Sequence, residues 1–267
     1  MKRSYSICWF GVVLCLLATA GGGFAQESEF VPHVTQPGKD VVWVPTPQEL
    51  VDAMLNMAKV TANDYVIDLG SGDGRTVITA AKRGATAKGI EYNPDMVEFS
   101  RRAAAKEGVT GKATFEQADL YVSDFSKATV ITMFLLPQIN INLRPKILDM
   151  KPGTRVVSNT FDMELWKPDQ TTNLTEGCAG WCTAYLWIVP AKVDGEWKLA
   201  DGKLTLHQDF QNLTGTITTG GKTMELIGKM DGEKISFNAA GAEYAGVVNG
   251  RTISGTRAAG GNWTASR

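Results

Sequence analysis

The sequence predicts an α/β domain built on a mostly parallel sheet, followed by a small antiparallel β domain. Apolar, strand-like runs alternate with helix-like segments over residues 43–192, the pattern of parallel strands joined by crossover helices. A glycine-rich turn separates the first of these strands from the next helix. After Pro190 the chain changes to short alternating segments punctuated by Asp-Gly, Asn-Gly and Gly-Gly pairs, which favour tight hairpins.

Composition limits the classes of partner. The chain has 267 residues with 27 Lys and Arg against 28 Asp and Glu, enough for one large and one small domain of near-neutral charge. It has no basic run, which argues against a nucleic-acid partner. Only two histidines are present, so no metal site is expected. Cys178 and Cys182 lie four residues apart and are candidates for a disulfide; the alternative is a pair of free thiols.

The first 25 residues have the three-part plan of a secretory signal. Lys2 and Arg3 precede an apolar run over residues 7–20, and small residues follow up to Ala25. The run is shorter than the ~20 residues of a membrane-spanning helix. We therefore expect export to the periplasm or medium, with cleavage near Ala25. The alternative is a retained N-terminal anchor, which would then be the chain's contact with the membrane.

The elements of the first domain follow from periodicity and punctuation. Residues 26–42 are polar and predict an extended arm. Pro47 suits the first turn of a helix capped by Thr46 and running to Ala58. The elements expected after it are a strand over 65–69, a helix over 74–83, a strand ending at Glu91, a helix from Asn93 to about Lys106, a strand over 113–117, a buried strand within 128–135, a short helix over 143–150, and strands over 154–157 and 184–189.

Residues 203–267 predict an antiparallel meander, either a small barrel or a sheet packed on one face. An internal repeat supports this, because residues 226–237 align with residues 244–255. One hairpin unit has therefore been used at least twice.

The glycine turn carries the main chemical signal. Its G-x-G-x-G spacing differs from the G-x-G-x-x-G of a dinucleotide site. An acid precedes the first glycine, which would repel a pyrophosphate but suits a sulfonium amino acid. The pattern indicates S-adenosylmethionine. The residues expected to hold it are Asp68, Gly70, Ser71, Gly72, Asp73 and Gly74.

Two further acids follow the next two strands. Glu91 ends the second strand, and Asp119, with Leu120 beside it, follows the third. Either acid alone is more often a solvated loop residue, and Asp73 alone is more often a helix cap. Together with Asp68 they follow three successive strands, whose carboxyl ends share the ligand-binding edge of an open α/β sheet.

These motifs resemble class I S-adenosylmethionine-dependent methyltransferases of the seven-β-strand type, over roughly residues 41–190. The resemblance implies a Rossmann-like methyltransferase sheet with helices on both faces. It also implies that the turn holds the methionine part of the cofactor, that Glu91 takes the ribose hydroxyls, and that Asp119 faces the adenine amino group.

Five segments resemble more closely the lysine methyltransferases that act on the ATP-synthase c-subunit and the adenine-nucleotide carrier, together with their bacterial relatives. They are Val-Pro-Thr-Pro at 44–47, the glycine turn at 68–75, Phe-Leu-Leu-Pro at 134–137, Leu-Arg-Pro-Lys at 143–146 and Lys-Pro-Gly-Thr-Arg-Val-Val-Ser at 151–158. This likeness implies a protein lysine as acceptor, with Thr46, Phe134 and Pro137 near the reacting groups. Thr46 is equally explained as a helix cap and Pro137 as a strand stop. The C-terminal β domain and the export signal depart from that family.

The expected function is therefore methyl transfer to a protein nitrogen. Two alternatives remain: a small-molecule methyltransferase, and an exported binding protein that kept the cofactor fold without activity. A lysine acceptor must lose its proton, which an apolar site favours. The aromatic residues that could wall such a site are Trp43, Tyr121, Phe134, Phe161 and Trp166.

Overall fold

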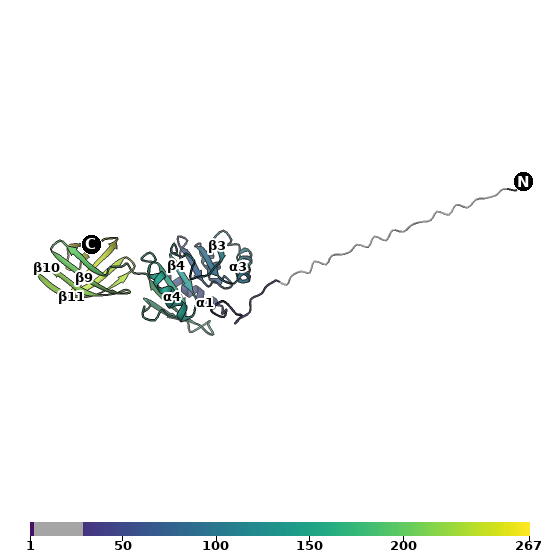
Figure 1. Ribbon diagram of the computed structural model, residues 1–267, viewed down its shortest axis with the longest axis horizontal. Helices are drawn as coiled ribbons and strands as arrows, with labels where there is room; N and C mark the ends of the chain where they lie inside the picture. The colour runs from purple at the N-terminus through teal and green to yellow at the C-terminus, as the bar shows by residue number, and fades with distance from the viewer. Residues whose placement is uncertain (3–28) are drawn as a thin grey trace. The chain divides into compact units, whose positions relative to one another are not determined.

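The computed structural model describes residues 1–2 and 29–267 of the chain (Figure 1). Most of the expected signal segment, 1–25, and the first residues of the expected arm, 26–42, lie outside the described residues. In the part of the chain that the structure describes, there is no helix long and apolar enough to cross a membrane.

The first sheet has seven strands in the order β3-β2-β1-β4-β5-β7-β6. The strands are β1 (Tyr65–Leu69), β2 (Thr86–Glu91), β3 (Ala113–Gln117), β4 (Val130–Met133), β5 (Arg155–Asn159), β6 (Gln170–Asn173) and β7 (Thr183–Ile188). β1 to β5 pair in parallel, whereas β7 pairs antiparallel with both β5 and β6. The predicted α/β sheet is confirmed.

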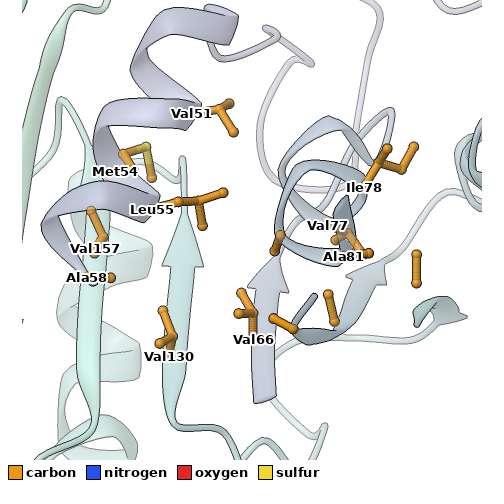
Figure 2. Close-up of a cluster of buried hydrophobic side chains, with 14 of the residues drawn as sticks. Val51, Met54, Leu55, Ala58, Val66, Val77, Ile78, Ala81, Val130 and Val157 are labelled. Carbon is orange, nitrogen blue, oxygen red and sulfur yellow. The ribbon is translucent and has the colours of Figure 1, made fainter. Parts of the chain in front are cut away.

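Helices cover both faces of this sheet, as predicted. They are α1 (Gln48–Met57), α2 (Arg75–Lys82), α3 (Pro94–Lys106) and α4 (Pro137–Leu148). Successive strand side chains point to opposite faces, so Val66 packs with α1, α2 and α3, while Ile67 packs with α4. Figure 2 shows the first of these clusters, in which α1 and α2 cover the apolar side chains of β1, β4 and β5. Burial on both faces explains why these strands have nearly continuous apolar sequences.

Three local predictions differ from the structure. Thr46 does not cap α1, because Pro47 is the N-cap residue and the Thr46 hydroxyl instead accepts a hydrogen bond from Asn159 Nδ2 at 3.2 Å. The helix expected over 143–150 begins six residues earlier and contains Pro145. The sequence does not predict β6, since its residues Gln-Thr-Thr-Asn are polar and lie at the edge of the sheet.

The second sheet is a closed eight-stranded barrel (Figure 1). Its strands are β8 (Gly195–Leu199), β9 (Gly202–Asp209), β10 (Asn212–Thr219), β11 (Lys222–Asp231), β12 (Lys234–Ala239), β13 (Ala242–Asn249), β14 (Thr252–Arg257) and β15 (Asn262–Ser266). The meander expected over 203–267 thus begins earlier, with β8, which pairs with both β9 and β15 and closes the barrel. Closure removes the unpaired edges that an open meander would expose.

The sequence repeat corresponds to two successive hairpins of the barrel. Residues 226–237 contain the β11–β12 turn, and residues 244–255 contain the β13–β14 turn. Equivalent positions are buried in both copies: Ile235 and Ile253 face the barrel interior, as do Leu226 and Tyr244. The repeat therefore preserves the inward-facing side of the strands.

Several contacts join the barrel to the first sheet and its loops. The Phe210 ring stacks on Trp166, with ring centroids 6.0 Å apart. Gln211 Nε2 donates to the Lys167 carbonyl at 2.8 Å, and Lys229 pairs with Asp169 at 2.9 Å. The barrel is thus packed against the segment between β5 and β6.

Candidate active site

A cavity of about 500 Å³ lies at the carboxyl ends of β1, β2 and β4, within the size range of small-molecule sites. It brings together most of the residues singled out in the sequence. Those that line it are Thr46, Asp68, Gly70, Ser71, Gly72, Asp73, Glu91, Asp119, Leu120 and Phe134. Gly74 and Pro137 are not among the lining residues. Within the described part of the chain, no lining residue comes from the barrel.

The glycine turn needs glycine for two different reasons. Gly72 has φ +54°, and a Cβ on it would come within 2.5 Å of Nε1 of Trp43, which lines the same cavity. Gly74 has φ +79°, and a Cβ there would clash with the Phe115 ring at 2.7 Å and with Ser100 Cβ at 2.9 Å. Gly72 therefore lets the backbone form the cavity wall, whereas Gly74 lets the start of α2 pack against β3 and α3.

Asp68 is a buried acid at the end of β1. Its Oδ1 accepts a hydrogen bond from Thr132 Oγ1 at 2.6 Å. Burial raises the pKa of Asp68 to about 7, and the nearby Asp73 and Glu91 contribute to the rise. This part of the cavity therefore favours a positively charged group, which would restore the ionised carboxylate.

Glu91 is fixed by the backbone. Its Oε2 accepts from the Gly72 N–H at 2.9 Å, and its Oε1 accepts from the Asn93 N–H at 2.9 Å. Each carboxylate oxygen retains a lone pair for a further donor. The two oxygens can thus receive a pair of hydroxyl groups without rearrangement of the side chain.

Asp119 pairs with Lys39 from the arm that precedes α1. Lys39 Nζ lies 2.6 Å from Asp119 Oδ2, while the Tyr121 N–H donates to Asp119 Oδ1 at 2.9 Å. The hydrogen bond from Lys39 lowers the pKa of Asp119, and the same bond raises the pKa of Lys39. Each oxygen of Asp119 thus accepts one hydrogen bond and keeps a lone pair for a ligand donor.

The arm forms part of the cavity wall, a role that sequence analysis does not reveal. All residues from Gln36 to Thr46 line the cavity. The arm folds back on itself, with the Thr35 N–H donating to the Trp43 carbonyl at 2.8 Å and the Trp43 N–H to the Gln36 carbonyl at 3.0 Å. Polar composition alone does not distinguish this folded arm from a linker.

Three of the five aromatic residues proposed for the acceptor wall line the cavity: Trp43, Phe134 and Phe161. The other two do not. Trp166 is fully buried in the core, between Trp187 and Phe210, and Tyr121 is not among the lining residues. Trp181, which sequence analysis does not single out, completes the aromatic part of the wall. It lies in the loop between β6 and β7, where no periodicity indicates its direction.

A disulfide joins Cys178 to Cys182 within that loop, with Cα atoms 5.8 Å apart. The two cysteines flank Trp181 in the chain. Pro137 is the first residue of α4, four residues after β4 ends at Met133, and it does not line the cavity. Among the described residues no three His, Cys, Asp or Glu side chains gather as a metal site would require.

The residues present fit S-adenosylmethionine. The glycine turn supplies backbone to the cavity wall, the buried Asp68 favours a cationic group, and Glu91 offers two oriented acceptors. Apolar residues from β2, α3 and the loop after β3 line the same cavity; they are Ile90, Met96 and Leu120. Such a surface suits a flat heterocycle such as adenine.

Comparison with known proteins places the same region in one family. The family model described as the ANTKMT methyltransferase domain matches residues 68–170. A protein-lysine N-methyltransferase of Saccharolobus islandicus is 41% identical over 163 residues, a match that covers 60% of this chain and 96% of that protein. The lysine N-methyltransferase of the ATP synthase c-subunit from Homo sapiens is 37% identical over 144 residues, covering 53% of this chain and 61% of that protein.

Among solved structures, an RNA methyltransferase from Salinibacter ruber, in complex with S-adenosyl-L-homocysteine, is similar to this chain. It has a TM-score of 0.53 and 45% sequence identity, and the match covers 56% of this chain and 96% of that chain. The chain therefore spans nearly all of the archaeal and Salinibacter proteins and about three fifths of the human one.

Proposed function

Because this chain belongs to the ANTKMT-type family of S-adenosylmethionine-dependent methyltransferases, we propose that it methylates the ε-amino group of a lysine side chain in a protein. It is a methyltransferase with S-adenosylmethionine as its cofactor. One observation supports the site assignment most directly: Asp68, Glu91 and Asp119, from three successive strand ends, line a single cavity with the glycine turn.

The proposed reaction needs alignment more than activation. When bound, S-adenosylmethionine supplies a methyl group on a positively charged sulfur, which keeps the electron pair of the broken S–C bond and becomes a neutral thioether. Asp68 and Glu91 would hold the two sides of the cofactor, and the rigid turn at Gly72 would fix its position. Holding donor and acceptor in line supplies most of the acceleration in such a transfer.

The acceptor nitrogen uses its lone pair to form the new N–C bond, so it must first lose its proton. The cavity is also lined by the aliphatic residues Met133, Leu135 and Ile139, and an apolar surrounding lowers the pKa of an amine. The nitrogen then carries the positive charge that the sulfur has lost. It can release a proton to water after transfer.

The names of the relatives support a protein acceptor, since both the archaeal and the human protein are lysine methyltransferases. The solved relative from Salinibacter ruber is named for RNA. The net charge of −1 weighs against RNA here, because binding to a phosphate backbone relies on basic side chains.

We also propose that the protein is exported. The N-terminal sequence supports this, with its two cations, apolar run and small residues before position 25. The disulfide is compatible with an oxidising compartment. Cell fractionation with N-terminal sequencing of the purified chain would test the proposal: an N-terminus near residue 26 in the exported fraction supports it, and an intact Met1 in the cytosol contradicts it.

The acceptor is tested by methyl transfer from isotopically labelled S-adenosylmethionine. The purified chain would be incubated with extracts of an otherwise identical strain that lacks the gene, and labelled sites mapped by mass spectrometry. Label on lysine that disappears with Glu91→Ala supports the proposal. Label on RNA, or on small molecules alone, contradicts it.

A further inference from the structure

Three of the aromatic rings that line the cavity form a cluster. The ring centroids of Phe134 and Phe161 lie 6.1 Å apart, and Trp181 lies 5.8 Å from each. The rings come from three separate places, namely the end of β4, the loop after β5 and the loop between β6 and β7. All three line the same cavity as Asp68 and the glycine turn.

The arrangement suits a cation. The three centroids lie 5.8 to 6.1 Å apart, so a cation seated over the cluster can lie within the ~6 Å reach of all three rings. Trp181 is tilted by 56° and 49° to the two phenylalanine rings rather than stacked on them. Its side chain is 48% exposed, so the cluster opens to solvent where a protein side chain could enter.

We propose that Phe134, Phe161 and Trp181 form the binding site for the acceptor amine, as an ammonium before proton loss and as a methylated ammonium after transfer. This inference rests on the proposed function, in which the nitrogen becomes positively charged as the methyl group arrives. Aromatic faces attract that charge without competing for the nitrogen lone pair.

The disulfide loop positions the third ring. Trp181 has φ +58°, a left-handed conformation that residues with a Cβ seldom adopt. The Cys178–Cys182 bridge spans it, and the Leu174 N–H donates to the Cys182 carbonyl at 2.9 Å. Cys178 and Cys182 are thus positioning residues: without the bridge, the loop is free to relax the Trp181 backbone and open the cluster.

The first experiment measures the cluster directly. Choline and its neutral carbon analogue 3,3-dimethylbutan-1-ol have the same shape, and each would be titrated into the full chain. Saturating S-adenosylhomocysteine would be present, so that Asp68, Glu91 and Asp119 are occupied and do not bind choline themselves. We expect choline to bind at least about three-fold more tightly than the alcohol. Trp181→Ala should abolish this preference and Trp181→Phe should keep part of it. Leu165→Ala removes another exposed apolar side chain, outside the cavity, and should change nothing.

The second experiment uses methyl transfer to the mapped lysine substrate. Trp181→Ala should raise the KM for the acceptor about three- to thirty-fold, with kcat and S-adenosylmethionine affinity little changed. Reduction of the disulfide should raise the same KM in the wild type but not in the Cys178→Ser, Cys182→Ser double variant, which starts with the raised value.

The outcomes separate the two proposals. Equal binding of choline and the alcohol, or an unchanged acceptor KM in Trp181→Ala, overturns the aromatic site while lysine methylation stands. Failure of the wild type to methylate any protein overturns the proposed function, and the choline measurement then still reports on the cluster by itself.

Discussion

Asp68 is a buried carboxyl group that also lines the cofactor cavity. Its raised pKa of about 7 means that the folded protein holds a proton that the unfolded chain, with a carboxyl pKa near 3.8, has released. The contribution of this group to folding stability should therefore be fully present below pH 4 and fall as the pH rises toward 7. The slope can reach about 1.4 kcal/mol per pH unit, because the unfolded state binds fewer protons than the native state.

The measurement is urea denaturation of the wild type and Asp68→Asn between pH 4 and 8. The asparagine keeps the oxygen that accepts from Thr132 but does not titrate. We expect the wild type to lose stability relative to the variant over this range. If the unfolding free energies of the wild type and the variant change in parallel with pH, Asp68 does not carry the proton.

The second prediction at the scale of one residue concerns Glu91 and cofactor binding. Its two oxygens are oriented by backbone N–H groups, so the cofactor hydroxyls would meet a fixed acceptor. Losing such a pair of hydrogen bonds costs about 1–3 kcal/mol. Glu91→Ala should weaken S-adenosylmethionine binding by about ten-fold or more in calorimetry. Glu225→Ala, which removes an exposed acid of the barrel, serves as the matched control; equal affinities for the two variants would refute the assignment.

At the scale of elements, the barrel depends on strand β8. Trp197 in this strand is 1% exposed, and its indole N–H donates to the Val193 carbonyl at 2.8 Å. Trp197→Ala should destabilise the barrel by about 3–5 kcal/mol, since it removes a large buried ring and leaves a cavity. Ile227→Ala, at a position 75% exposed on β11, should cost under about 0.5 kcal/mol. Chemical denaturation measures the free energy of unfolding of both variants. Similar decreases in the two would mean that β8 does not contribute to the core as described.

Element boundaries also show where sequence patterns are informative. The β1 and β4 strands are predictable because they are buried on both faces, which requires continuous apolar sequence. β8 escapes prediction because its sequence Gly-Glu-Trp-Lys-Leu is short and begins with the glycine of a turn-like Asp-Gly pair. Residue type alone predicts Thr46 as a helix cap. Its hydroxyl instead bonds Asn159, a partner from a distant strand that local sequence does not reveal.

At the scale of the whole molecule, the described residues that line the cavity all precede β7. A truncated chain ending at Val193 should therefore keep its affinity for S-adenosylmethionine. The truncation removes the Phe210 ring that stacks on Trp166, so the fold of the truncated chain must be checked as well. Calorimetry on the truncated and full chains makes the comparison, with circular dichroism to verify folding. Complete loss of binding by a folded truncated chain would place the barrel in the cofactor site.

The candidate site is only partly predictable from sequence. Asp68, Glu91 and Asp119 follow strand ends, so topology alone gathers them at one edge of the sheet. Lys39 and Trp181 come from an arm and a loop, whose paths depend on tertiary contacts and on a disulfide. Residues placed by regular elements are accessible to prediction, whereas those placed by irregular backbone are not.

The pairing that closes the barrel has a consequence for the order of folding. β15 pairs with β8 through residues far apart in the chain, whereas each other barrel strand pairs with its sequence neighbours. A contact of such wide sequence separation forms late, because the intervening loop entropy must be lost first. As the chain is synthesised, every strand of the first sheet is available before β15 exists. The catalytic half can therefore mature first, and the barrel becomes resistant to proteolysis only when its last strand arrives.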